Sequence, residues 1–265
     1  MLNMVMWGVG GGELRFGDLA GPRCPVVLTH GAGMDHRMFE AQARALHEAG
    51  HRVIVWDQAG HGGSSLAPGA RFTSALALDC LIALLDHLGL DRPILVGHSL
   101  GGNLSQALVR RCPSRVSGLI VVDSAWNAGP LTALDRFLLK LAGPSLALVP
   151  ASWLPGVMAR ASAVTPEGIA ESEATFARMP KRVFLDVWRA TVSFVDSDPG
   201  YRTPVPLGLI RGERDRTGNI ASAMPRWARA EGVAEHVIPG AGHVVTLDAA
   251  EATTAAILEI INSWP

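Results

Sequence analysis

The chain has 265 residues, 48% of them hydrophobic, which is enough for one large domain with a sizeable core and argues against a disordered polypeptide. Its 23 basic and 24 acidic side chains nearly cancel, so no electrostatic footprint for nucleic acid or for an anionic membrane is present. Three cysteines without C-x-x-C spacing predict reduced thiols, no disulfide framework and a reducing, cytoplasmic location.

Two segments could be mistaken for targeting or membrane signals. The first twelve residues have no basic side chain before their apolar residues, so no signal peptide is expected. The stretch from Leu141 to Ala159 carries no charge and is long enough to span a bilayer. Three prolines and two glycines interrupt it, so we expect short helices there and no membrane span.

The first half of the chain alternates short apolar runs, typical of buried strands, with stretches whose apolar residues recur at helical spacing. Strands that are apolar on both faces and alternate with helices predict an α/β fold, with a mostly parallel central sheet and helices on both faces. We expect a leading hairpin at 4–7 and 13–17, strands at 25–29, 52–56, 94–96 and 116–122, and helices at 37–48 and 73–88.

The strand pattern stops between Trp126 and Tyr201, where we expect several short helices. We interpret residues 126–202 as a helical cap inserted into a core that residues 1–125 and 203–265 form. The pattern resumes at 205–210, although Pro206 is unfavourable inside a central strand. We expect a helix at 220–230, a strand at 234–238 and a last helix that Asp248 caps.

The run Gly97-His98-Ser99-Leu100-Gly101 follows an apolar strand and precedes apolar positions at helical spacing. In that context the pattern G-x-S-x-G is typical of a nucleophile elbow. A sharp turn exposes the serine hydroxyl, and only small residues fit where the backbone passes close by on either side. The alternative is a glycine-rich turn with an idle serine.

A serine hydroxyl acts as a nucleophile near neutral pH only with a base, which in turn needs an orienting carboxylate. We predict that His243, in the glycine-rich loop after the last strand, is the base. We predict that Asp215, after the preceding strand, is the carboxylate. The three loops would then meet at the carboxyl ends of parallel strands, where open α/β sheets bind ligands. Asp123, which ends the strand next to the elbow, and Glu213 are rival acids.

Together with the elbow, the motifs His30-Gly31, Gly212-Glu213-Arg214-Asp215 and Gly242-His243 resemble the α/β-hydrolase family over nearly the whole chain outside the cap. The resemblance implies the α/β-hydrolase fold with a helical cap, and its spacing favours Asp215 over the rival acids. It also implies an oxyanion hole made by the backbone N–H groups of Leu100 and Ala32. Removing one such donor typically costs about 3 kcal/mol of transition-state stabilisation.

Most other polar candidates have a structural interpretation. We expect His30 to brace its loop through backbone hydrogen bonds, His98 to point away from the nucleophile and His61 to support a tight turn. Asp57 is expected to fix the loop that follows its strand. His36 is equally compatible with the wall of the pocket and with the surface.

A serine at the elbow implies an acyl-enzyme formed from an ester, lactone, thioester or amide and then cleaved by water. Relatives that the chain resembles but that cleave haloalkanes or epoxides carry aspartate there instead. The apolar cap predicts a small-molecule substrate, an apolar carboxylic ester or lactone, with Trp126, Trp153 and Val244 as candidates for the pocket wall. No cluster with metal-ligand spacing is present, and no metal or cofactor is expected.

Three other functions use the same residues. A carbon–carbon bond hydrolase of a β-diketone-like compound and a cofactor-free perhydrolase would share the fold and the serine. A receptor that binds a small ligand without turnover would belong to a different class, since fold alone does not fix function. The sequence leaves open the identity of the substrate and the oligomeric state.

Overall fold

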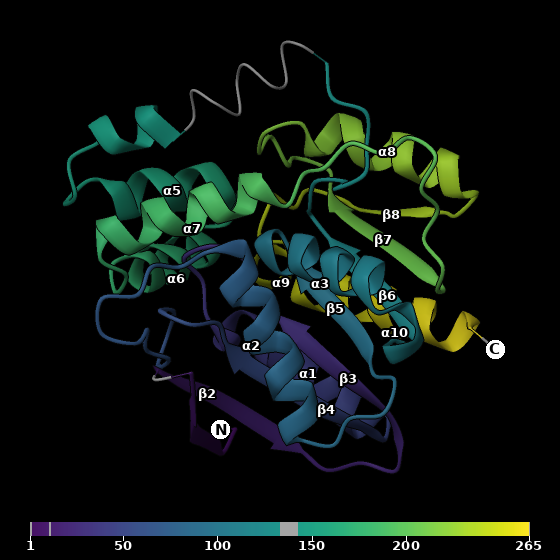
Figure 1. Cartoon of the computed structure of the whole chain (residues 1–265). Helices are drawn as coiled ribbons and strands as arrows, with labels where there is room; N and C mark the ends of the chain where they lie inside the picture. The colour runs from purple at the N-terminus through teal and green to yellow at the C-terminus, as the bar shows by residue number, and fades with distance from the viewer. Residues whose placement is uncertain (1, 11, 133–142, 265) are drawn as a thin grey trace.

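The computed structural model describes residues 2–10, 12–132 and 143–264. In this part of the chain the centre is an eight-stranded sheet with the order β1-β2-β4-β3-β5-β6-β7-β8 (Figure 1). The strands are β1 (Met4–Val9), β2 (Gly12–Leu19), β3 (Arg23–Thr29), β4 (His51–Asp57), β5 (Ile94–His98), β6 (Gly118–Val122), β7 (Leu207–Gly212) and β8 (Glu235–Ile238). The β1–β2 and β2–β4 pairs are antiparallel and the other neighbouring pairs are parallel, which confirms the predicted hairpin and sheet.

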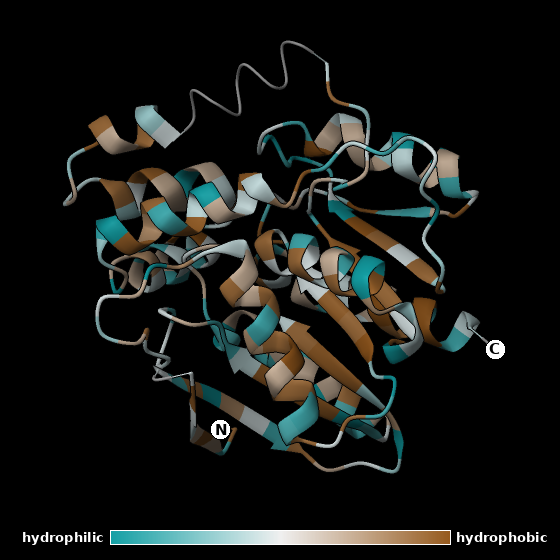
Figure 2. Cartoon of the chain, viewed as in Figure 1, coloured by the Kyte–Doolittle hydropathy of each residue, from teal (hydrophilic) through white to brown (hydrophobic). Residues whose placement is uncertain are grey.

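Helices cover both faces of the sheet, as predicted. Those of the core are η1 (His36–Phe39), α1 (Glu40–Glu48), α2 (Ser74–His87), α3 (Leu100–Arg111), η2 (Pro113–Arg115), α8 (Ile220–Glu231), α9 (Val245–Asp248) and α10 (Ala250–Ser263). Helices α2, α3 and α8 pack on one face, and α1 and α10 on the other. Successive side chains of β6 pack alternately into the two hydrophobic layers on either face of the sheet, because strand side chains alternate between faces. Figure 2 shows the central strands as largely hydrophobic.

Several boundaries differ from the predicted ones for simple reasons. Strand β7 begins at Leu207, directly after Pro206, whose carbonyl accepts a hydrogen bond from the backbone N–H of Leu119. Proline has no N–H to donate to the ladder, so the strand excludes it. The helix expected at 37–48 divides into η1 and α1. Thr73 caps α2 as expected, since its hydroxyl accepts from the N–H of Leu76 at 3.1 Å.

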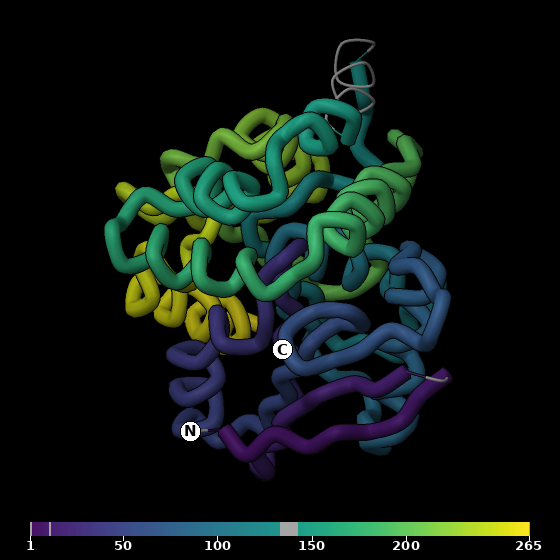
Figure 3. Tube along the Cα trace, turned by 90° about the vertical axis from the view of Figure 1, so that its left-hand side faces the viewer, coloured from purple at the N-terminus to yellow at the C-terminus, as the bar shows by residue number. Residues whose placement is uncertain are grey.

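The described residues of the region predicted as a cap include the helical residues 143–148 and the helices α5 (Leu154–Ser162), α6 (Pro166–Phe176) and α7 (Lys181–Ser193), and they form no strand. The three helices lie together beside the sheet in Figure 1 and face the viewer in Figure 3. The apolar stretch that begins at Leu141 is not one helix. Residues 141 and 142 lie outside the described part, and Pro150 separates helical residues 143–148 from α5.

No helix within the described ranges is long and apolar enough to cross a membrane. The three cysteines are unpaired, as expected: Cys24 is exposed, Cys80 is buried and Cys112 is half-buried.

The prediction that Asp248 caps the last helix is wrong. The residue before α10 is Ala249, which makes no side-chain capping bond. The carboxylate of Asp248 turns instead toward the region after α5, where it accepts from the backbone N–H groups of Val164 at 3.1 Å and Thr165 at 2.9 Å. It also accepts from the N–H of Gly242 at 2.9 Å. The carboxylate of Asp248 therefore joins the segment after α5 to the loop that precedes α9.

Candidate active site

Ser99 lies at the corner between β5 and α3 with φ 51° and ψ −116°. A positive φ is unusual for a residue with a side chain and persists only where the surroundings impose it. Here the backbone is fixed on both sides. The N–H of Ser99 donates to the carbonyl of Val122 at 2.9 Å, and its carbonyl accepts from the hydroxyl of Ser124 at 2.7 Å. The backbone geometry is therefore that of a strained elbow.

The two glycines of the motif are required by close backbone contacts. A Cβ atom on Gly97 would lie 2.3 Å from the carbonyl oxygen of Gly101. A Cβ atom on Gly101 would lie 2.1 Å from that of Thr29, in the neighbouring strand β3. Real Cβ atoms essentially never approach backbone so closely, so the elbow accepts only glycine at both positions.

Asp215 and His243 meet as the sequence predicts. Asp215 follows β7, and His243 lies in the loop between β8 and α9; their side chains are joined by a 3.0 Å contact between Nδ1 of the imidazole and Oδ2 of the carboxylate. Both residues are buried. The N–H of Thr217 donates to the other carboxylate oxygen at 2.7 Å. Burial acts to raise the pKa of Asp215, but the charge and hydrogen bond of His243 and the bonds of Thr217 outweigh it and hold this pKa at about 2.

Ser99 and His243 line the same cavity, which has a volume of about 40 Å³. Ala32, from the loop after β3, and Val244 also line it. The remaining wall is mostly apolar, and much of it comes from helices α5, α6 and α7: Met34, His98, Met158, Ser162, Phe176, Phe184, Trp188 and Thr217. Leu100 is the first residue of α3, and the first N–H groups of a helix have no partner within it.

Two of the residues predicted for the pocket wall do not reach this cavity. Trp126 stacks on Trp227 with ring centroids 5.8 Å apart, and both line a separate cavity of about 390 Å³ beside α2, α3 and α8. Trp153 precedes α5 and is 68% exposed. The composition of the cap indicated apolar packing but not which side of each helix faces the serine. Of the three pocket candidates, only Val244 lies beside Ser99.

His98 contributes to the site in a way that the sequence did not suggest. Its Nε2–H donates to the backbone carbonyl of His243 at 2.8 Å, and the two rings lie 4.8 Å apart. A carbonyl only accepts, so the proton of the neutral ring is on Nε2. Burial, together with the nearby imidazole of His243, lowers the pKa of His98 to about 3, so the ring stays neutral. No local pattern could have identified this bond, because 145 positions separate the two residues.

His30 braces its loop as expected. Its Nδ1–H donates to the carbonyl of Gly31 at 2.8 Å, while Nε2 accepts from the N–H of Gln58 at 2.9 Å. One neutral tautomer satisfies both bonds, and burial lowers the pKa of the ring. His61 is also buried, in the turn after β4, and burial lowers its pKa to about 3.

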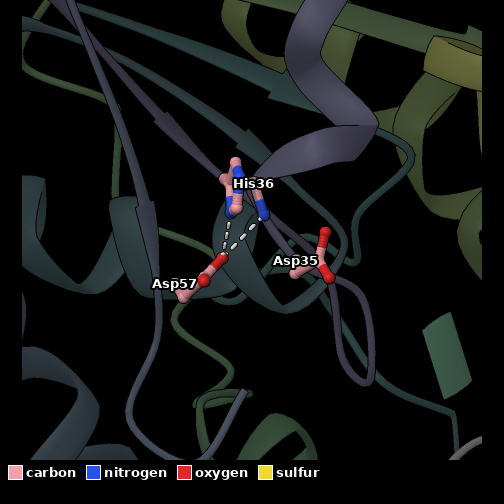
Figure 4. Close-up of side chains that lie close together, drawn as sticks. All are labelled: Asp35, His36 and Asp57. Carbon is pink, nitrogen blue, oxygen red and sulfur yellow. Dashed lines mark hydrogen bonds and ion pairs between the residues drawn. The ribbon is translucent and has the colours of Figure 1, made fainter. Parts of the chain in front are cut away.

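Asp35, His36 and Asp57 form a second cluster of buried side chains (Figure 4). Asp57 Oδ1 accepts from both the backbone N–H and Nδ1 of His36, at 2.8 and 2.7 Å, and Oδ2 accepts from Gly63. Asp35 is instead paired with Arg37. These bonds fix the loops after β3 and β4, which confirms the interpretation of Asp57. His36 is buried against Asp57 and does not line the cavity at Ser99.

An α/β sheet with a strained serine elbow at its carboxyl edge defines the class of protein. The model of the alpha/beta hydrolase family matches residues 26–256, and the chain belongs to this family. It is 28% identical to "Putative carbamate hydrolase RutD" from Variovorax paradoxus (strain S110) over 89% of this chain and 91% of that protein.

Solved structures agree with the fold. A thermophilic esterase from Thermogutta terrifontis is 26% identical, with a TM-score of 0.79 and 98% of each chain covered. The enol-lactonase from Burkholderia xenovorans LB400 is 20% identical, with a TM-score of 0.80, and 98% of this chain and 100% of that chain are covered. At that identity the second likeness shows the fold alone. The family and the names of these relatives support a hydrolase.

Proposed function

We propose that the protein is a serine hydrolase that cleaves a small carboxylic ester or lactone through an acyl-enzyme. The observation that carries the proposal is the shared cavity: Ser99, on its strained elbow, and His243, joined to Asp215, line one space. An alcohol, an imidazole and a buried carboxylate in this order are the groups that acyl transfer requires.

In the proposed mechanism, Nε2 of His243 takes the proton of the Ser99 hydroxyl while Oγ attacks the carbonyl carbon of the substrate. Asp215 holds Nδ1–H of the imidazole, fixes its tautomer and stabilises the imidazolium that forms. The imidazolium then gives its proton to the leaving alcohol. Water repeats the sequence on the acyl-enzyme and releases the acid.

The backbone N–H groups of Leu100 and Ala32 are the proposed donors to the negative oxygen of the tetrahedral intermediate. Leu100 supplies an N–H that helix α3 leaves without a partner, at the positive end of the helix dipole. Ala32 lines the same cavity as Ser99 and comes from the loop after β3. Donors already in place need no reorganisation as the charge develops.

The size of the cavity favours a small acyl group. Its volume of about 40 Å³ is far below the roughly 300–1,000 Å³ of pockets that bind drug-sized ligands. Phe176, Phe184 and Trp188 make its far wall apolar. The name of the RutD relative includes a carbamate, which has a carbonyl group as an ester does. The same mechanism would apply to a small carbamate.

Two measurements test the proposal. A fluorophosphonate probe should label the wild type and the control Ser222→Ala, whose serine lies on α8, but not Ser99→Ala. Across p-nitrophenyl esters of increasing chain length, kcat/KM should be greatest for the acetate. Equal turnover by Ser99→Ala and the wild type would refute the assignment of Ser99 as the nucleophile. A folded wild type without turnover would favour the alternative of a receptor that binds a small ligand.

A further inference from the structure

Asp123 lies close to the Asp215–His243 pair and has no part in the mechanism above. It follows β6, is fully buried and has a φ of 42°. Its N–H donates to the carbonyl of Ile210 at 2.9 Å, and its Oδ1 accepts from the N–H of Gly212 at 2.8 Å. The carboxyl group is therefore fixed between the ends of β6 and β7, next to the turn that carries Asp215.

The second oxygen of this carboxyl group has no donor. Oδ2 of Asp123 is sealed from solvent, and no N–H or O–H group in the described part of the chain donates to it. A carboxyl oxygen of Asp123, one of Asp215 and a ring nitrogen of His243 all lie within 4.8 Å of one another. An ionised Asp123 would combine an unpaired buried oxygen with a second carboxylate beside it, and both are costly. One proton on Asp123 removes both costs.

The two carboxyl groups have unequal partners, which decides where the proton lies. Asp215 receives bonds from His243 and Thr217, whereas Asp123 has only the N–H of Gly212. Burial raises the pKa of Asp123 well above its ordinary value, and the charge of Asp215 raises it further. Asp215 keeps the negative charge of the pair.

We propose that Asp123 is a neutral carboxylic acid whose O–H donates to the carboxylate of Asp215 and so holds that carboxylate in place for His243. Asp123 is then a positioning residue, and the proton stays on it throughout the reaction. Its effect on catalysis rests on the proposed function, whereas its protonation does not.

The protonation is tested directly by NMR of protein labelled with ¹³C at the aspartate carboxyl groups. One signal, absent from Asp123→Asn, should keep the shift of a protonated carboxyl from about pH 5 to about pH 8. A signal that already has the ionised shift at about pH 5 would overturn the proposal. So would a stoichiometric metal ion, found by mass spectrometry in the wild type and lost in Asp123→Asn, since a cation would then satisfy both carboxylates.

Thermal unfolding gives a second readout of the same proton. Above the ordinary pKa of aspartate the unfolded chain releases this proton and the folded chain keeps it, so the wild type loses stability as the pH rises. Asparagine has no proton to release. The unfolding midpoint of Asp123→Asn, relative to the wild type, should therefore rise by about 3 °C or more between about pH 4 and about pH 8. A difference that is constant or falls with pH contradicts the proposal.

The positioning role is tested by comparing two substitutions. Asp123→Ala removes the O–H donor to Asp215, while His243 and Thr217 remain, and should lower kcat by roughly 10–100-fold with little change in KM, because small displacements of a catalytic group are costly. Asp123→Asn, whose amide N–H can replace the O–H, should recover most of that loss. Equal losses in both variants would refute the role of the O–H. If Ser99→Ala keeps full turnover, the proposed function fails, and the carboxyl titration still decides whether Asp123 is protonated.

Discussion

The carboxylate of Asp248 accepts the backbone N–H of Gly242, which precedes His243, and the same carboxylate accepts the N–H and the hydroxyl of Thr165 at the start of α6. The N–H of Val244 also donates to the carbonyl of Ser162, at 3.0 Å. The loop that carries the proposed base is therefore hydrogen-bonded on one side of His243 to the end of α5 and is joined on the other side, through Asp248, to the start of α6.

Asp248→Ala should loosen this connection. Because hydrogen bonds to a charged group contribute more than neutral ones, we expect the free energy of unfolding to fall by about 2–3 kcal/mol. We also expect kcat to fall while a fluorophosphonate still labels Ser99, only more slowly. Chemical denaturation and labelling rates measure the two effects. Thr165→Val removes one donor to Asp248 together with the N-cap of α6, leaves the backbone donors in place, and should show a smaller loss of both.

Asp215→Asn should preserve the fold and abolish most of the activity. The amide would favour the wrong tautomer of His243, a change that costs roughly 10,000-fold in kcat in a comparable triad. Steady-state kinetics with circular dichroism of the variant measure this. Glu213→Gln is the control, because Glu213 accepts from the N–H of Gly240 and is not bonded to His243. A greater loss in the control would identify Glu213 as the acid.

His98→Phe should keep an aromatic ring beside His243 but remove the hydrogen bond to its backbone carbonyl. We expect kcat to fall by roughly tenfold or more, since the hydrogen bond that helps to hold the backbone of His243 in place would be lost. His98→Gln, whose amide can donate to the same carbonyl, should lose less. The ratio of the two kcat values is the measurement, and equal values would show that only the volume of the ring matters.

Gly101→Ala should destabilise the protein severely, because its Cβ atom would meet the backbone of Thr29 at 2.1 Å. A clash with backbone relaxes poorly, so we expect a loss of about 3 kcal/mol or more in the free energy of unfolding. Gly8→Ala, in β1, is the control, since its Cβ atom would have nothing within 4 Å. Denaturant titrations of the two variants should differ clearly, and similar midpoints would show that the elbow can relax.

The stability of the fold should fall with acid partly through Asp57. Burial acts to raise its pKa, but the hydrogen bond and charge of His36 and the bond from Gly63 outweigh it and hold the pKa at about 2. The unfolded chain therefore binds this proton first, and the stabilisation present above the ordinary pKa is lost as the pH falls toward 2. Asp57→Asn should cost about 2 kcal/mol at neutral pH and progressively less as the pH falls. Denaturation across this range measures the gap, and a gap independent of pH would contradict the explanation.

The features that could be predicted from the sequence are those that depend on local residue patterns and on the order of elements along the chain. Five residues around Ser99 defined the elbow, because steric limits at Gly97 and Gly101 act within one turn of chain. The alternation of strands and helices predicted the sheet, and the motifs ending in Asp215 and His243 predicted which loops converge.

What remained hidden depends on contacts between distant segments. Asp248 was assigned to the nearest helix end, yet its partner Thr165 lies 83 positions away. Trp126 was proposed for the pocket wall, but its ring stacks on that of Trp227. Asp123 was weighed only as a rival acid, since nothing local reveals that its second oxygen has no donor.

The backbone at Ser99 has a thermodynamic consequence. A φ of 51° combined with a ψ of −116° is comfortable only for glycine, and a side chain held in such a conformation costs on the order of 1–3 kcal/mol. A chain with glycine at this position would be more robust against heat and would have no hydroxyl to offer. The protein therefore gives up some of its resistance to unfolding to present a single oxygen atom.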